Sequence, residues 1–329
     1  MTIQTAEHAH STAAPARARD YVALLRPSQW IKNVVVLSGP AAGLKLSSPV
    51  SAGQALLAFA AFCLTASATY AINDVLDREA DARHPTKRNR PVARGAIRPT
   101  TATGIGCALV IAAATATSVY LNTYVTIVLL LYFGLTLAYS AALKRQVILD
   151  VIVVATGFVL RAWAGSLAVG VLTSEWLVAC VFTLCLFMGF GKRRCELAMI
   201  GNMDEAGQHR STLLRYTPDL LNHLITVSAG VALITFLLYT LDSGSHPAPF
   251  HKAHLFYTLP LVVYGVFRYA MLTELGIHSG PTEIVLEDRA LLATILAWVV
   301  IALIIAYEMP LFGAGGLERL LQPGPTGGP

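Results

Sequence analysis

The sequence predicts an all-α, polytopic membrane protein, and three observations support that fold class. Of the 329 residues, 55% are hydrophobic and only 13% are charged, about half the charged share of a soluble globular domain. The mean hydropathy is +0.60. The apolar residues also form long blocks, and the uncharged block at 99–143 is about twice as long as one membrane-spanning helix requires. This composition excludes a disordered chain, a secreted disulfide scaffold and an ordinary soluble enzyme.

Nine transmembrane helices are expected from these apolar blocks. The block at 99–143 divides at Asn122, where we expect a short turn between two helices. Residues 176–191, 220–241 and 290–307 also lack charge and define three further helices. The nine expected spans are 28–46, 51–73, 100–119, 123–142, 147–170, 175–192, 219–241, 253–272 and 289–308.

The loops between these spans alternate in charge, which indicates an orientation. The N-terminal segment and every second loop after it carry 20 of the 24 lysines and arginines. Because cytoplasmic loops carry an excess of basic residues, we expect the N-terminus and these loops in the cytoplasm and the chain in the inner (plasma) membrane. Residues 1–20 and 311–329 are then expected to be disordered tails, and residues 21–310 the transmembrane domain.

A stripe of acidic residues closes the second span, which ends in the sequence NDVLDREAD at 73–81. Asn73, Asp77 and Asp81 are four residues apart, so a helix places them on one face, with Asp74 beside them. Carboxylates at this spacing repel one another and favour a bound cation. Magnesium prefers such oxygen ligands and completes its shell with water and phosphate oxygens. The alternative is a solvated helix end without a metal.

A basic loop follows this acidic stripe directly. Residues 82–98 contain six basic side chains and no acid, and His84-Pro85 should end the helix at the start of the loop. Carboxylates for a metal beside cations for phosphate suit a diphosphate–magnesium complex. Binding of the loop to anionic lipid headgroups is the alternative. The candidate phosphate-binding residues of this loop are Arg83, Lys87, Arg90 and Arg94.

The pattern NDxxDxxxD at a helix end, followed by a basic loop with an Arg-Pro pair, resembles the first motif of the UbiA superfamily of intramembrane prenyltransferases. The resemblance covers nearly the whole chain. It implies nine transmembrane helices around a central apolar cavity that holds a polyprenyl chain. The residues that would bind magnesium and serve catalysis are Asn73, Asp74, Asp77 and Asp81.

The chain departs from that family after its sixth span, where ordinary members carry a second acidic motif. This position reads GKRRCE at 191–196, so three cations replace the expected acids. One acidic and one basic wall suit a single metal plus a phosphate that the metal does not contact. Phosphoribosyl pyrophosphate has such a separate phosphate. The candidate ligands for it are Lys192, Arg193 and Arg194.

Three segments resemble one branch of the superfamily, the phosphoribosyltransferases that act on decaprenyl phosphate. These segments are 26–33, 139–144 and 191–194. The resemblance implies transfer of 5-phosphoribose from phosphoribosyl pyrophosphate to polyprenyl phosphate, with release of diphosphate, as a precursor step for cell-envelope arabinan. Magnesium is the expected cofactor. A direct displacement would invert the configuration at C1.

Several isolated ionisable residues are further candidates for substrate contact, because such residues within spans are costly without a function or a partner. Lys32 lies in the first span, where snorkelling to the interface is the alternative. Asp150 opens the fifth span and could pair with Lys144 or Arg145, or contact ribose or metal. Arg161 lies near mid-membrane, facing the cavity and the lipid phosphate or forming an internal salt bridge. The candidates are Lys32, Tyr139, Lys144, Asp150, Arg161 and Arg268.

Two other functions compete with this interpretation. An ordinary prenyltransferase would move a prenyl group from its diphosphate to an aromatic acceptor, but the second acidic motif is missing. A transporter or scaffold would not require charges concentrated on one side, and no polar track crosses the apolar blocks. The charge pattern indicates the lipid bilayer and no nucleic acid as a partner. It leaves the oligomeric state open, a homo-oligomer included.

Overall fold

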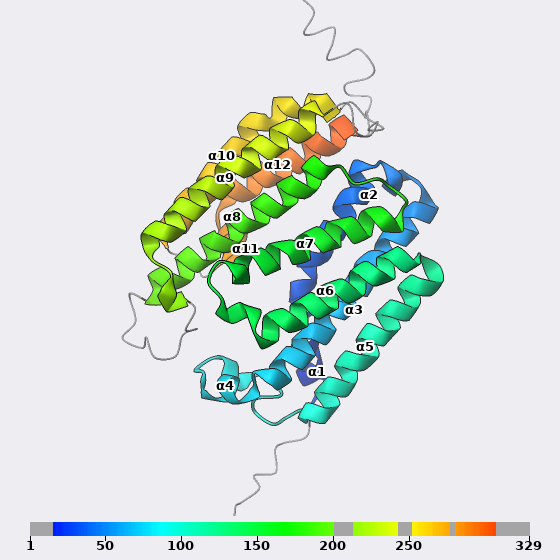
Figure 1. Cartoon of the computed structure of the whole chain (residues 1–329), viewed down its shortest axis with the longest axis vertical. Coiled ribbons are helices and arrows are strands. Elements are labelled where there is room, and N and C mark those ends of the chain that lie inside the picture. The colour runs from blue at the N-terminus through cyan, green and yellow to red at the C-terminus, as the bar shows by residue number, and fades with distance from the viewer. Residues whose placement is uncertain (1–15, 201–212, 243–251, 277–279, 307–329) are drawn as a thin grey trace, which may run out of the picture.

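The computed structural model describes residues 16–200, 213–242, 252–276 and 280–306, and within them it is a helical bundle without β-strands (Figure 1). The α-helices are α1 (Ala18–Leu25), α2 (Ser38–Ala42), α3 (Pro49–Leu76), α4 (Arg78–Arg83), α5 (Pro99–Tyr120), α6 (Thr123–Ala141), α7 (Leu149–Ala168), α8 (Glu175–Ile200), α9 (Pro218–Leu241), α10 (Leu259–Leu275), α11 (Pro281–Glu287) and α12 (Arg289–Ala306). The 3-10 helices are η1 (Pro27–Leu37), η2 (Lys45–Ser47), η3 (Lys87–Asn89), η4 (Leu143–Arg145), η6 (Leu213–Arg215) and η7 (Lys252–Thr258).

Eight helical stretches in the described part are long and apolar enough to cross a membrane. They are α3, α5, α6, α7, α8, α9, the continuous stretch Ala253–Leu275 and α12. These eight coincide with the second to ninth expected spans, so the all-α membrane fold is confirmed. The turn at Asn122 is confirmed as well, because its side chain caps α6 by accepting a hydrogen bond from Val125 N at 3.0 Å.

The expected count of nine is not confirmed, because the first expected span, 28–46, is not a regular α-helix. It consists of the 3-10 helix η1 followed by the short helix α2. Pro40 lacks a backbone donor and the valines at 34–36 are β-branched, so both disfavour a continuous α-helix here. The segment still packs closely on α7, where a Cβ on Gly165 would lie 1.7 Å from the Val36 carbonyl oxygen.

The helices pack around α3 and α7. Helix α3 contacts α5, α6, α7 and η1. Helix α7 packs against α8, which in turn packs against α9. One apolar core joins η1, α3, α5, α6 and α7 and includes Phe62 and Tyr132, whose ring centroids are 5.3 Å apart. A second core joins α7 to α12 and includes Phe187 and Tyr269 at 5.1 Å. The two cores share α7, which therefore positions the two halves of the bundle.

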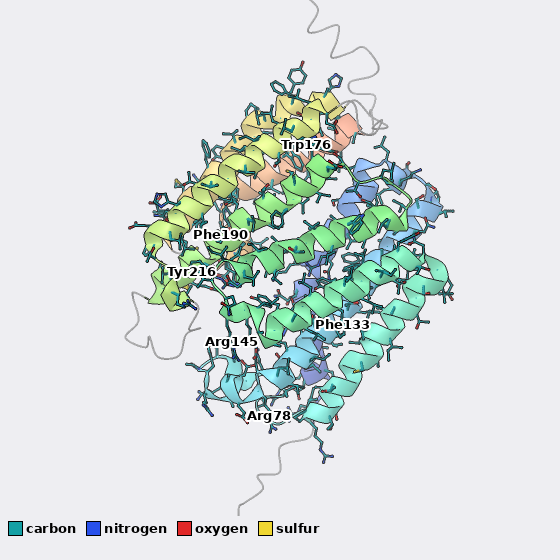
Figure 2. The ribbon with its side chains drawn as sticks, viewed as in Figure 1. Arg78, Phe133, Arg145, Trp176, Phe190 and Tyr216 are labelled. Atoms are coloured by element: carbon teal, nitrogen blue, oxygen red, sulfur yellow. The ribbon has the colours of Figure 1, made fainter. Side chains whose placement is uncertain are left out.

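The charged helix ends gather at one end of this bundle. The end of α3, helix α4, the start of α7 and the end of α8 lie together at the lower left of Figure 1. Figure 2 shows Arg78, Arg145 and Tyr216 at this end, whereas Trp176 lies at the opposite end. The alternation of loops rich and poor in basic residues, expected from the sequence, therefore corresponds to one charged end of the fold.

Helix α1 is anchored to the basic loop by a buried carboxylate. Asp20 accepts a hydrogen bond from its own helix at Arg17 N, 2.9 Å away, and forms an ion pair with Arg94. Leu24 packs with Val92 and Ile97 beneath this pair. The helix begins inside the segment expected to be a tail, and residues 1–15 and 307–329 of the two expected tails lie outside the described residues.

Removal of this anchor should destabilise the protein in a pH-dependent way. The Arg17 N–H and the Arg94 guanidinium lower the pKa of Asp20 against the opposing effect of burial. A carboxyl group with a lowered pKa stabilises the fold above its unfolded-state pKa of about 3.9 and loses that effect as pH falls through the folded-state pKa. We expect detergent-solubilised Asp20→Asn to melt at a lower temperature than wild type at pH 7. A melting difference that stays constant below pH 4 would contradict this origin.

Candidate active site

The acidic stripe lies where α3 passes into α4. Helix α3 ends at Leu76, and Asp77 forms the junction between the two helices. The Asp77 N–H donates to the Asn73 carbonyl oxygen at 2.9 Å, and the Asp81 N–H to that of Asp77 at 2.8 Å. These bonds preserve the four-residue spacing across the junction. Helix α4 ends before His84, as the His84-Pro85 pair predicts.

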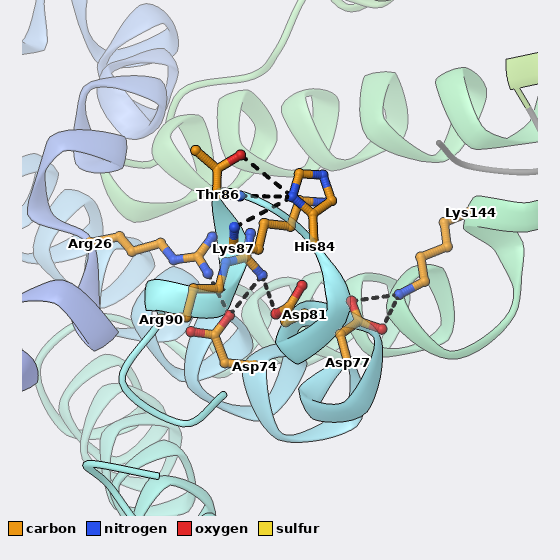
Figure 3. A network of polar contacts seen from close by, with 9 residues as sticks. All are labelled: Arg26, Asp74, Asp77, Asp81, His84, Thr86, Lys87, Arg90 and Lys144. Carbon is orange, nitrogen blue, oxygen red and sulfur yellow. Dashed lines mark hydrogen bonds and ion pairs between the residues drawn. The ribbon is translucent and has the colours of Figure 1, made fainter. Parts of the chain in front are cut away.

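Each carboxylate of the stripe is paired with a cation from another segment (Figure 3). Asp74 Oδ1 accepts hydrogen bonds from Arg26 and, at 3.2 Å, from Arg90 Nη1. The same Arg90 nitrogen donates to Asp81 Oδ2 at 2.7 Å. Lys144 Nζ lies 2.6 and 2.8 Å from the two carboxylate oxygens of Asp77. The end of α3 is therefore the centre of an ion-pair network that joins η1, the basic loop and η4.

The metal expected at this stripe has no preformed cage in the described part of the chain, where no group of three histidine, cysteine or acidic residues is arranged to hold an ion. The donor set nevertheless fits magnesium. Asp74 is 1% exposed, and its Oδ2 atom is buried without a hydrogen-bond partner. An unpaired buried carboxylate oxygen is costly, and a hard divalent cation would satisfy it. The adjacent Asn73, Asp77 and Asp81 side chains supply further oxygen ligands.

Asp150 does not pair with Lys144 or Arg145. Its Oδ2 atom accepts from Arg193 Nε at 2.8 Å and its Oδ1 atom from the Tyr216 hydroxyl at 2.8 Å. The Tyr216 hydroxyl in turn accepts from the Ile148 N–H at 2.6 Å. Both Asp150 and Arg193 are buried. This pair therefore joins the start of α7 to the end of α8.

The three cations at 192–194 do not form one wall. They belong to the last turns of α8, where successive residues point about 100° apart. Arg193 points inward and also pairs with Glu196, while Arg194 Nε donates to Asn222 Oδ1 at 3.1 Å. Lys192 is exposed and lies 3.6 Å from Glu196. Of the three, Lys192 is the most accessible to a separate phosphate.

Arg161 is 8% exposed and has no acidic partner among the described residues. Its Nε donates to Asn33 Oδ1 at 2.8 Å and its Nη2 to the Tyr132 hydroxyl at 2.7 Å. The guanidinium also lies over the rings of Tyr132, at 4.5 Å, and Phe158, at 4.8 Å. The internal salt bridge considered for this residue is therefore not what balances its charge. Neutral acceptors and aromatic ring faces stabilise the guanidinium instead and leave its charge uncancelled.

Lys32 lies among cations. Its side chain is exposed, forms no ion pair within the described part, and experiences the charges of Lys192, Arg161 and Arg26. Lys32, Arg161 and Lys192 come from η1, α7 and α8, and α7 packs against both of the other two elements. Such a cluster of like charges favours an anionic ligand. Both substrates expected from the sequence, phosphoribosyl pyrophosphate and polyprenyl phosphate, would provide phosphate groups.

Some of the remaining predicted site residues lie near the acidic stripe, and others hold helices together. Lys87 and the exposed Arg83 lie in or beside the loop after α4, and Tyr139 lies near the end of α6. Arg94 joins α1 to the loop, as described above. Arg268 Nη2 lies 2.8 Å from Asp288 Oδ2, and Asp288 also caps α12. Arg94 and Arg268 are therefore engaged in holding helices together.

Several residues of the network were not among the predicted ones. Arg26 and Asn33 lie within the segment 26–33 whose resemblance had already been noted, so the signal for them was present. Tyr132 and Tyr216 had no such signal, because their partners are contributed by other helices. Glu196 pairs with Lys192 and Arg193 of its own helix, at the four- and three-residue spacings that the sequence shows.

Replacement of Arg193 should separate a structural role from phosphate binding. Arg193→Met leaves Asp150 buried without its cation, and breaking a buried pair costs about 3–5 kcal/mol. We expect a lower free energy of unfolding in detergent and partial recovery in the double variant Arg193→Met/Asp150→Asn. Lys192→Gln is the matched control and should unfold as wild type does. Unchanged stability of Arg193→Met would contradict the structural role.

The chain resembles known proteins along most of its length. The model of the UbiA prenyltransferase family matches residues 34–275. A decaprenyl-phosphate phosphoribosyltransferase of Corynebacterium glutamicum is 34% identical over 296 residues, which cover 88% of this chain and 87% of that protein. The enzyme of the same name from Mycolicibacterium smegmatis is 34% identical over 305 residues, covering 89% and 95% of the two chains.

Solved structures show the same fold at lower identity. The structure of a UbiA homolog from Archaeoglobus fulgidus bound to DMAPP and Mg²⁺ aligns with a TM-score of 0.66 and 17% identity, covering 88% of this chain and 100% of that one. The digeranylgeranylglyceryl phosphate synthase structure aligns with a TM-score of 0.60 and 16% identity, over 88% and 99% of the two chains. With the sequence match and the shared fold, the chain belongs to the UbiA prenyltransferase family.

Proposed function

We propose that the protein transfers the 5-phosphoribosyl group of phosphoribosyl pyrophosphate to polyprenyl phosphate, with decaprenyl phosphate as the acceptor, and releases diphosphate. The observation that carries this proposal is the charge pattern of the charged end. Carboxylates at 74, 77 and 81 lie around the junction of α3 and α4, while the position of the family's second acidic motif holds Lys192, Arg193 and Arg194. Two proteins named decaprenyl-phosphate phosphoribosyltransferase, each 34% identical over most of the chain, support transfer of a phosphoribosyl group and the same acceptor.

The reaction needs little proton chemistry from the protein. The acceptor phosphate is already anionic near neutral pH, so its oxygen attacks C1 of the ribose without a general base. The new C1–O bond forms as the bond from C1 to the diphosphate oxygen breaks, and the electron pair leaves with diphosphate. The transition state has oxocarbenium character, as in other glycosyl transfers. A direct displacement converts the α-linked donor into a β-linked product.

The residues of the stripe would hold magnesium in this reaction. When bound there, magnesium neutralises charge that develops on the leaving diphosphate. The candidate ligands are Asn73, Asp74, Asp77 and Asp81. Arg83, Lys87 and Arg90 lie in or beside the loop that follows, where they stabilise the same leaving group by charge-assisted hydrogen bonds.

The phosphates distant from the metal have other partners in this proposal. Lys192, accessible at the end of α8, binds the 5-phosphate of the donor, with Arg193 and Arg194 held beside it by the scaffold. Lys32 and Arg161 attract the acceptor phosphate into the middle of the bundle. Tyr139 and Asp150 lie near the ribose. The basic loops, and with them the site, face the cytoplasm of a cell with an inner membrane.

A transfer assay tests the donor and the acceptor together. Purified protein is given radiolabelled phosphoribosyl pyrophosphate, polyprenyl phosphate and magnesium, and labelled lipid is extracted and counted. We expect labelled lipid in the complete mixture and none when magnesium is chelated. A parallel reaction receives labelled prenyl diphosphate and an aromatic acceptor. Product in the parallel reaction alone would replace the proposed function with ordinary prenyl transfer.

Loss of one carboxylate of the stripe tests the metal site. Asp77→Asn removes a charge from the proposed ligand set, and we expect turnover to fall by about a hundredfold or more, as when a major electrostatic contribution to catalysis is lost. Glu79→Gln is the matched control, because Glu79 is exposed in α4 within the same segment. It should retain wild-type turnover. Equal activity of both variants, each correctly inserted, would remove the stripe from the metal site.

A further inference from the structure

Arg26 occupies an unusual position at the edge of the stripe. It joins α1 to η1 with φ 51° and ψ 60°, a left-handed conformation that glycine and asparagine adopt more readily than arginine. Its guanidinium lies 4.9 Å from the ring centroid of Tyr70 and donates to Asp74. The conformation and the ring contact together hold the guanidinium of Arg26 against a buried carboxylate of the stripe.

Asp74 is unevenly satisfied by its partners. Arg26 and Arg90 both donate to its Oδ1 atom, whereas its Oδ2 atom is buried and has no hydrogen-bond partner. Full pairing of a carboxylate would use both oxygens, as Lys144 does at Asp77. The arginines therefore hold Asp74 in place while leaving one oxygen available to another cation. Figure 3 shows this arrangement, with Arg26 and Lys144 approaching the stripe from opposite sides.

The charges of this network balance almost completely. Three carboxylates, at 74, 77 and 81, face the three cations Arg26, Arg90 and Lys144. A divalent metal entering alone would add two positive charges to three carboxylates that these cations already balance and that lie beside further basic residues of the loop. A metal entering together with a diphosphate adds little net charge, because the anion accompanies it. The arrangement therefore disfavours the free metal and favours the metal–diphosphate pair.

We propose that Arg26, Arg90 and Lys144 are exchangeable counter-ions, which release the carboxylates of the stripe to a divalent metal and bind the accompanying diphosphate in the same step. This inference rests on the proposed metal–diphosphate site and adds a mechanism of selection to it. The three cations suit the exchange, because their side chains are 23%, 24% and 12% exposed while Asp74 is 1% exposed. Guanidinium groups bind phosphate oxygens as readily as carboxylates.

The exchange makes Arg26 act on the two ligands in opposite directions. Arg26→Gln removes a cation that competes with the metal, so the full-length variant should bind Mn²⁺ alone, as a probe for the metal, more tightly than wild type. The same variant lacks a donor to phosphate, so inorganic diphosphate in the presence of metal should bind more weakly. We expect about tenfold for each shift, the usual size for one charge-assisted hydrogen bond. Titration calorimetry of the detergent-solubilised protein measures both affinities.

Two further variants separate this role from general effects of charge. Arg98→Gln removes the same charge from an exposed position at the end of the basic loop that contains Arg90, and it should leave both affinities at the wild-type values. Arg26→Lys retains a cation and should restore weak binding of the metal alone. Because Arg26 also joins α1 to η1, a thermal unfolding curve accompanies each titration. If Arg26→Gln is misfolded, Lys144→Gln must show the same two opposite shifts for the proposal to stand.

A metal affinity that is unchanged or lower in these variants would overturn the exchange and make the cations a fixed part of the scaffold. The titration is independent of the transfer reaction, because inorganic diphosphate contains neither ribose nor lipid. Opposite shifts without labelled lipid in the transfer assay would therefore disprove the proposed donor or acceptor and leave the exchange intact. Labelled lipid without opposite shifts would disprove the exchange and leave the proposed donor and acceptor intact.

Discussion

The pairing of buried carboxylates with arginine or lysine is the constraint on which the charged end of this protein depends. Burial of an unpaired carboxylate costs several kcal/mol, so each buried acid must lie beside a cation. Asp20, Asp74, Asp81 and Asp150 are all buried, and all four pair with an arginine. These pairs connect α1, η1, the basic loop and the ends of α7 and α8 around the end of α3. Ion pairs between buried carboxylates and arginines therefore largely determine how the helices are arranged at this end.

The cations of this end divide into two groups. Arg94, Arg193 and Arg268 are engaged by carboxylates that tie helices together, away from the stripe. Arg26, Arg90 and Lys144 instead hold the carboxylates that are suited to a metal. A basic residue near a phosphate site is therefore not by itself a ligand for phosphate. Its carboxylate partner decides whether it belongs to the scaffold or is available for exchange.

Arg161 represents a different solution to the same constraint. It is buried in the middle of α7 without a carboxylate among the described residues, and Asn33, Tyr132 and Phe158 surround it. Neutral acceptors and ring faces stabilise a cation while leaving its net charge in place. The bundle interior therefore keeps a positive charge at Arg161 that no carboxylate of the described residues cancels, which is the property that an anionic lipid headgroup entering it would require.

The sequence by itself determined what depends on local spacing. The apolar blocks predicted eight of the spanning stretches, the four-residue spacing predicted the stripe, and Asn122 and His84-Pro85 predicted where helices end. The tertiary structure decided what depends on distant partners. Lys144 lies 67 residues from Asp77 and Arg193 lies 43 from Asp150, so no local pattern could assign these pairs. The broken first span depends on both levels, because Pro40 and the valines at 34–36 disfavour a continuous α-helix, while α7 provides the surface on which the 3-10 segment packs at Gly165.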